Sequence, residues 1–204
     1  MAQGKLKLDN AASYASELKD INPSIVNDKF LEKNKEIEVD VAIDNVSIVS
    51  SKLPDIDVKF FQTKKEFYEL INEEGIFRLK TVKKNNRLGI KRGEITIFIP
   101  DGMIFNKALM NNISGDLKIA NFNANEIIAS SVSGNIIFEN TEADAKLCAR
   151  SVSGDIAFNR CKIGFLKADN VSGDIVVENS NYIDSSFNCL SGDIDVVTNN
   201  NESN

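Results

Sequence analysis

The C-terminal half of the chain repeats one short motif five times. Each copy reads aliphatic, Ser, Gly, Asp or Asn, aliphatic, and its serine falls at position 114, 133, 153, 172 or 191, which gives spacings of 19, 20, 19 and 19 residues. A fixed period of this length is the signature of a repeat architecture. The motif therefore predicts a stack of rungs of about twenty residues, one rung for each copy.

Apolar residues alternate with polar ones on both sides of each motif. This period of two is typical of β-strands with one buried face. After the motif, the alternating pairs are Leu117/Ile119, Ile136/Phe138, Ile156/Phe158, Ile175/Val177 and Ile194/Val196; before it, they are Ile127/Ala129, Leu147/Ala149, Leu166/Ala168 and the weaker Ser185/Phe187. We predict an all-β fold, a single-stranded β-solenoid (β-helix) with two strands and a corner in each rung, right-handed by the preference of parallel crossovers.

The first half of the solenoid is less regular. Degenerate alternation is found in residues 37–43, 55–60, 75–79 and 93–99. We therefore assign residues 36–197 to the solenoid, with irregular rungs over 36–112 and regular rungs over 113–197.

Two flanking segments are predicted to lie outside the solenoid. In residues 1–35, Tyr14, Leu18 and Ile21 follow helical spacing before Asn22-Pro23. This pattern indicates a short helix that caps the first rung, with a partner-binding helix as the alternative. Residues 198–204 are polar and low in complexity, which predicts a disordered tail.

The motif residues are interpreted as structural turns. Glycine permits the positive φ of a tight corner, and Asp or Asn accepts a hydrogen bond from a backbone N–H two residues on. The alternative is a calcium site built from stacked carboxylates, which Asn135 and the long period disfavour. The turn residues are Ser114, Gly115, Asp116, Ser133, Gly134, Asn135, Ser153, Gly154, Asp155, Ser172, Gly173, Asp174, Ser191, Gly192 and Asp193.

Small polar residues stand two positions before each serine. They are Asn112, Ser131, Ser151, Asn170 and Cys189. Strand alternation turns them inward, where a hydrogen-bonded ladder is a more economical interpretation than a binding site. The other cysteines, Cys148 and Cys161, lie in no CxxC unit, and the chain has no His, so neither a disulfide framework nor a metal or other cofactor is predicted.

Charge and composition exclude several function classes. With 24 Lys+Arg against 30 Asp+Glu, the net charge of −6 argues against nucleic-acid binding. No apolar run approaches the roughly 20 residues that span a bilayer, and no signal peptide is apparent. The one basic cluster is read as a solvated hairpin, with contact to an anionic polymer or membrane as the alternative; it comprises Arg78, Lys80, Lys83, Lys84, Arg87, Lys91 and Arg92.

Sequence motifs give little support for catalysis. The chain has no His for acid–base chemistry and no Trp to stack a sugar ring. Stacked carboxylates keep a polysaccharide-active enzyme open as an alternative, and it would need a groove with two acids about 5–10 Å apart and a basic neighbour. An intracellular scaffold or regulatory partner is a third interpretation.

The repeated Val-Ser-Gly-Asp-Ile, together with the Ile95–Pro100 strand and the Val39–Phe60 stretch, resembles the bacterial "putative adhesin" domain family of unknown function. The similarity covers about residues 36–197. It implies a non-enzymatic β-solenoid of the bacterial cell surface or envelope that binds or scaffolds through extended sheet faces. The partner implied is a surface or envelope component of unknown identity, and the resemblance carries no catalytic residues over to this chain.

Overall fold

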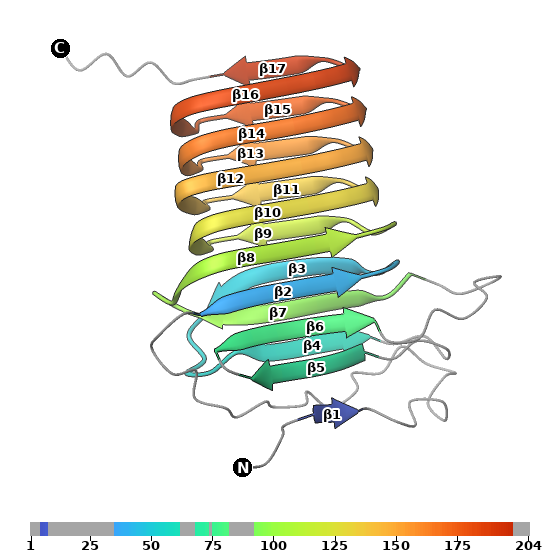
Figure 1. Cartoon of the computed structure of the whole chain (residues 1–204), viewed down its shortest axis with the longest axis vertical. Coiled ribbons are helices and arrows are strands. Elements are labelled where there is room, and N and C mark those ends of the chain that lie inside the picture. Colours follow the sequence, from blue (N-terminus) through green and yellow to red (C-terminus); the bar gives the residue numbers. More distant parts are fainter. Residues whose placement is uncertain (1–4, 8–34, 62–67, 74, 82–91, 198–204) are drawn as a thin grey trace.

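The chain forms a tall stack of β-strands (Figure 1). The computed structural model describes residues 5–7, 35–61, 68–73, 75–81 and 92–197. Throughout these residues the regular secondary structure is β, arranged as two sheets that face one another across an apolar interior. The predicted all-β solenoid is confirmed, while its handedness stays a prediction. The expected helix over residues 11–21 and the tail 198–204 lie outside the described residues.

The described residues form seventeen strands, all of which belong to the two sheets. The nine-stranded sheet A has the order β1 (Lys5–Lys7), β5 (Tyr68–Glu73), β6 (Ile76–Thr81), β2 (Glu36–Val41), β8 (Ile104–Asn112), β10 (Asn123–Ser133), β12 (Glu142–Ser153), β14 (Lys162–Ser172) and β16 (Asn181–Ser191). The eight-stranded sheet B has the order β17 (Ile194–Val197), β15 (Ile175–Glu178), β13 (Ile156–Asn159), β11 (Ile136–Glu139), β9 (Leu117–Ala120), β3 (Asn45–Ser51), β7 (Glu94–Pro100) and β4 (Asp57–Phe61).

From β8 onward the rungs follow the chain in order. Each rung has a long strand in sheet A and a short strand in sheet B, and consecutive rungs pair in parallel. Equivalent side chains therefore form interior columns, such as Leu117, Ile136, Ile156 and Ile175, which are at most 1% exposed. Phe138 and Phe158 stack with ring centroids 5.3 Å apart. Because a half-buried strand cannot cover its own apolar face, this stacking creates the core.

The first rung in the chain is not at the end of the stack. Strand β2 lies between β6 and β8, and β3 lies between β7 and β9. The rung made by β6 and β7 therefore sits below a rung that precedes it in sequence. The buried Asp44, in the turn between β2 and β3, fixes this arrangement: its carboxylate accepts hydrogen bonds from the Tyr68 hydroxyl at 2.7 Å and the Gly93 N–H at 2.6 Å.

The stack is no longer parallel at its N-terminal end. Strand β4 runs antiparallel to β7, β5 antiparallel to β6, and β1 antiparallel to β5. The alternation in residues 55–60 thus marks an antiparallel edge strand and not a further solenoid winding.

Candidate functional site

At four of the five motif corners the glycine lies directly against the glycine of the rung below, while Gly115, in the first corner, lies against the backbone carbonyl of Asp44. A Cβ built on Gly134 would lie 2.2 Å from the carbonyl oxygen of Gly115, and one on Gly154 would lie 2.4 Å from that of Gly134. Positive φ was the expected reason for these glycines, and Gly154, Gly173 and Gly192 do adopt it. Gly115 and Gly134 are not in that conformation, so close backbone stacking is the requirement that all five share.

The Asp/Asn positions form a hydrogen-bonded ladder along the stack. Asp116 Oδ1 accepts the backbone N–H of Asn135 at 2.8 Å, and Asn135 Oδ1 accepts that of Asp155 at 2.8 Å. In the next two rungs, Asp155 Oδ1 accepts the backbone N–H of Asp174, and Asp174 Oδ1 accepts that of Asp193, each at 2.9 Å. The bond was expected two residues on within the same turn; it instead joins equivalent residues of consecutive rungs, because stacking places the next N–H above each side-chain oxygen.

The small polar column lies inside the corner, as strand alternation indicates. Asn112, Ser131, Ser151 and Asn170 are at most 5% exposed, and Cys189 is half-buried. Asn170 Nδ2 donates to the carbonyl of Gly154 at 2.9 Å, and Cys189 Sγ lies 3.2 Å from that of Gly173. Each contact reaches the corner glycine of the preceding rung and not the neighbouring member of the column. The Ser131 and Ser151 hydroxyls have no partner, so the expected continuous ladder does not form there.

The opposite corners, from sheet B back to sheet A, carry a signal that sequence analysis missed. Asn121, Asn140, Arg160 and Asn179 have φ between 46° and 55°. Asn tolerates this left-handed conformation better than most residues, whereas Arg does not. Their spacing of 19, 20 and 19 residues matches that of the serines and could have revealed the second corner. The cysteine beside Arg160 is buried, and burial raises the pKa of the Cys161 thiol, which disfavours a reactive thiolate.

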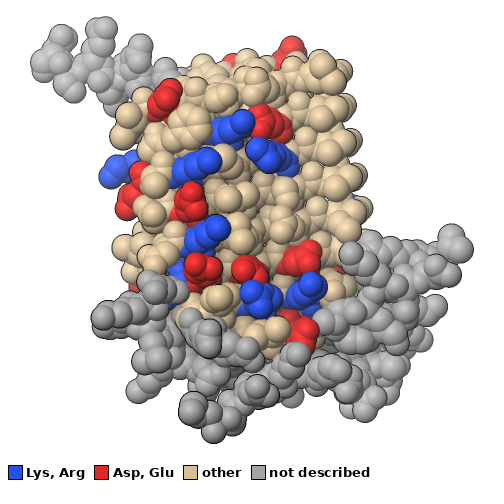
Figure 2. Space-filling model, viewed as in Figure 1, with Lys and Arg blue, Asp and Glu red and all other residues tan. Residues whose placement is uncertain are grey.

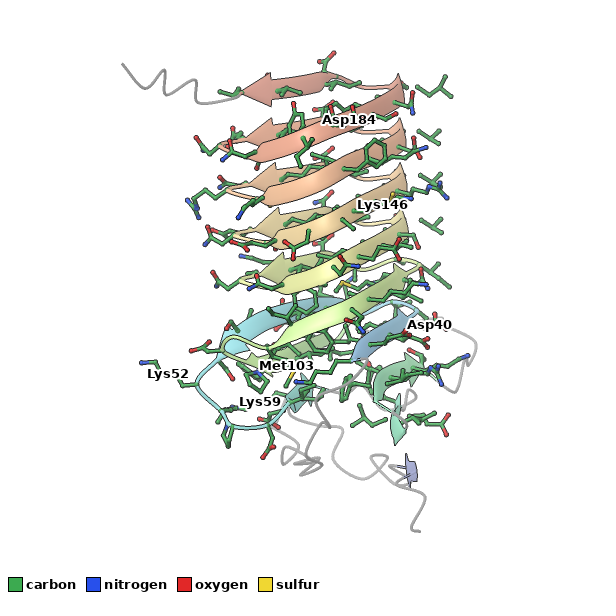
Figure 3. All side chains as sticks on the ribbon, turned by 60° about the vertical axis from the view of Figure 1, so that its left-hand side comes forward. Asp40, Lys52, Lys59, Met103, Lys146 and Asp184 are labelled. Atoms are coloured by element: carbon green, nitrogen blue, oxygen red, sulfur yellow. The ribbon has the colours of Figure 1, made fainter. Side chains whose placement is uncertain are left out.

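The outer face of sheet A presents a continuous polar column, which we call the polar track. Parallel register aligns its members from rung to rung, and Figure 2 shows acidic and basic side chains interspersed over this face. The track consists of Lys80, Asp40, Asn111, Ser130, Arg150, Asp169 and Asn188. Of the track members, Asp40 is labelled in Figure 3; Lys146 and Asp184, which are not part of the track, mark rungs nearer the C-terminal end of the stack.

Hydrogen bonds between rungs hold the polar track in place. Ser130 Oγ donates to Asn111 Oδ1 at 2.6 Å, Arg150 Nε to Asp169 Oδ2 at 3.3 Å, and Asn188 Nδ2 to Asp169 Oδ1 at 2.8 Å. Burial alone would raise the pKa of Asp169, but the hydrogen bonds from Asn188, Lys167 and Arg150 outweigh it and the pKa lies below its ordinary value. Asp169 is therefore ionised at neutral pH.

A shallow depression lies where the track reaches β2 and β6. It is lined by Glu38, Val39, Asp40, Arg78, Lys80, Leu109 and Asn111. Arg78 hydrogen-bonds Glu38, and Lys80 Nζ lies 3.8 Å from Asp40 Oδ2. The Arg78 hydrogen bond lowers the pKa of Glu38. Two members of the predicted basic cluster are thus paired with carboxylates, while Lys83, Lys84, Arg87 and Lys91 lie outside the described residues.

Two other kinds of feature are absent from the described residues. No group of three or more metal-binding side chains converges there. Nor does that part of the chain contain a helix with the length and hydropathy to cross a membrane.

Comparison with known proteins identifies the family. The model described as Toastrack DUF4097 matches residues 34–204. The chain belongs to this family. The Toastrack match covers the whole solenoid, including the early rungs whose spatial order departs from the sequence. A search of curated proteins finds no match.

Two solved structures resemble this Toastrack chain. One is a "putative adhesin" from Bacteroides fragilis, with 15% identity, a TM-score of 0.41, and coverage of 83% of this chain and 94% of the other. The other is a "putative cell adhesion protein" from Clostridium sporogenes, with 10% identity, a TM-score of 0.38, and coverage of 81% and 97%.

Proposed function

We propose that the chain is a non-enzymatic, adhesin-like solenoid of the bacterial cell surface or envelope that binds an extended polymer along the polar track. The observation that carries this proposal is the alignment of hydrogen-bonding side chains, one per rung, on one flat face. Bonds between Ser130 and Asn111 and between Arg150 and Asp169 hold these groups before any ligand arrives. Preorganised groups lose little entropy on binding, which favours affinity.

The side chains beside the track suit a polymer with both polar and apolar surface. Leu109 and Ile128 are half-buried in the adjacent outward column of sheet A, where they stack in register. Donors and acceptors recur at the strand spacing of about 4.8 Å, so a long chain can contact several rungs at once. A glycan of the cell wall or envelope has this combination of hydroxyl groups and apolar ring faces.

Co-sedimentation with isolated cell-wall material, and titration with soluble envelope glycans, test this function. We expect the double variant Asn111→Ala/Arg150→Ala to bind at least about tenfold more weakly than the unmodified chain. The matched control, Asn159→Ala/Lys118→Ala, removes the same kinds of groups from the outer face of sheet B and is expected to bind normally. Failure of the unmodified chain to bind any envelope component, or equal losses in both variants, would contradict the proposal.

A polysaccharide-active enzyme is the second candidate, favoured by the depression beside the track. Strand geometry places Glu38 and Asp40 on one face roughly 7 Å apart, with basic residues adjacent. However, a general acid needs a raised pKa, and Arg78 lowers that of Glu38. Release of reducing or unsaturated sugar ends from envelope polysaccharides, abolished by Glu38→Gln, would establish this candidate in place of the binding function.

A further inference from the structure

The C-terminal end of the stack is an open rung. Ile175 and Val177 in β15 are 0% exposed, whereas Ile194 and Val196, at the same register positions in β17, are 43% and 38% exposed. In sheet A, Phe187 of β16 is only half-buried, whereas Ala168, at the same register position in β14, is 0% exposed. The interior columns of the solenoid therefore continue to an uncovered surface, although terminal repeats ordinarily present a polar outer face.

The open rung also presents unpaired backbone groups. The N–H of Gly173 donates to the carbonyl of Ser191 at 3.1 Å, and that of Ile175 donates to the carbonyl of Asp193 at 2.9 Å. Gly192 and Ile194 occupy the same places one rung later, and no further strand covers them within the described residues. Such an edge is a template for an added strand.

Charge at this end is of one sign. Residues 168–197 contain no Lys or Arg, and their acids are Asp169, Asp174, Glu178, Asp184, Asp193 and Asp195. Asp193 and Asp195 flank the exposed Ile194 on β17, and Asp184 lies on β16, near the end of the stack in Figure 3. End-to-end contact between two copies would bring these carboxylates together, so like-charge repulsion disfavours a second copy as the occupant.

We propose that the open edge of β17 is a docking site for an extended segment of a partner protein in which aliphatic and basic residues alternate. Aliphatic side chains of that segment would cover Ile194 and Val196, as β17 itself covers Ile175 and Val177 in the rung below. Its Lys or Arg side chains would turn outward toward Asp195 and the neighbouring Asp193, while its backbone would pair with Gly192 and Ile194. This interaction is separate from the polar track, because it uses the end of the solenoid and not its face.

Fluorescence anisotropy with a labelled octapeptide of alternating Lys and Val tests the proposal. We expect saturable binding, with an octapeptide of alternating Glu and Val failing to bind. The variant Asp193→Asn/Asp195→Asn keeps the shape of the edge and removes two charges, and it is expected to weaken binding by about tenfold at low salt. The variant Val196→Lys, which places a cation in the apolar surface, is expected to abolish it.

Two controls make a negative result decisive. Glu126→Gln/Glu142→Gln removes two charges in the middle of the stack and is expected to leave peptide binding unchanged. Analytical ultracentrifugation is expected to show a monomer. Absence of saturable binding, equal binding of the Lys and Glu peptides, equal losses in the edge and mid-stack variants, or self-association abolished by Val196→Lys would each overturn the proposal.

Discussion

The Asp155 carboxylate accepts the backbone N–H of Asp174, its counterpart in the next rung, at 2.9 Å. We expect Asp155→Ala to lower the free energy of unfolding by about 1 kcal/mol, the usual contribution of such a bond. Asp155→Asn keeps the accepting oxygen and is expected to change stability little, because Asn135 already fills this role in its own rung. Urea denaturation of the two variants checks the prediction; an equal loss in both would show that charge, and not the ladder bond, matters.

Close stacking at the corners predicts a sharp contrast between two glycines. In Gly134→Ala the new methyl group meets the Gly115 carbonyl, which belongs to the backbone and cannot move aside. We expect a loss of at least about 3 kcal/mol. Gly102 has φ +77° and open space around it, so Gly102→Ala is expected to cost only about 1–2 kcal/mol of conformational strain. Thermal unfolding distinguishes the two, and a milder effect at Gly134 than at Gly102 would refute the stacking argument.

The regular rungs were predictable because core, turn and register repeat together. The pairs Ile136/Phe138 and Ile156/Phe158 were assigned to one buried face from alternation alone, and they stack in register in the structure. Parallel stacking makes this inference robust, since a slip of one residue would expose the whole apolar set.

Other features could not be read from the repeat. The two aliphatic residues of one motif look alike in sequence, yet Val132 is 49% exposed and Ile136 is 0% exposed, because the corner turns one outward and the other inward. The position of β2 between β6 and β8 depends on long-range contacts of Asp44 that no local pattern encodes. The polar track was missed because its members share a position in the rung and not a residue type.

Arg160 is the one non-Asn residue at the left-handed corner positions. We expect Arg160→Asn to raise the free energy of unfolding by up to about 1 kcal/mol, because Asn tolerates this φ better. The gain is reduced by loss of the exposed contact between Arg160 and Glu139, which contributes about 0.5 kcal/mol. Arg160→Ala loses the contact and keeps the strain, so it is expected to destabilise the protein. Chemical denaturation compares the two, and equal effects would rule out backbone strain as the cause.

The ion pair between Glu38 and Arg78 predicts a dependence of stability on pH. The Arg78 hydrogen bond lowers the folded-state pKa of Glu38 from 4.5, so the unfolded chain takes up this proton first as the pH falls. The stabilisation is complete above the unfolded pKa and is lost as the pH falls through the lower, folded value. We expect Glu38→Gln to be less stable than the unmodified chain at pH 7, with the difference disappearing at more acidic pH. A difference that stays constant across this range in urea titrations would contradict the assignment.

Asp44 is expected to be the most sensitive polar residue of the early rungs. Its buried carboxylate joins the β2–β3 turn to Tyr68 and Gly93, and Asn112 Nδ2 donates to its backbone carbonyl at 2.8 Å. Asp44→Ala leaves a buried hydroxyl and a buried N–H without their acceptor, at a cost of about 3 kcal/mol. Tyr68→Phe removes one of these bonds and its donor together, so we expect a loss of only about 1 kcal/mol. Hydrogen exchange checks where the effect falls. If Asp44→Ala lowered amide protection in β16 and β17 as much as in β2 and β7, Asp44 would stabilise the whole stack and would not specifically anchor the rung formed by β2 and β3.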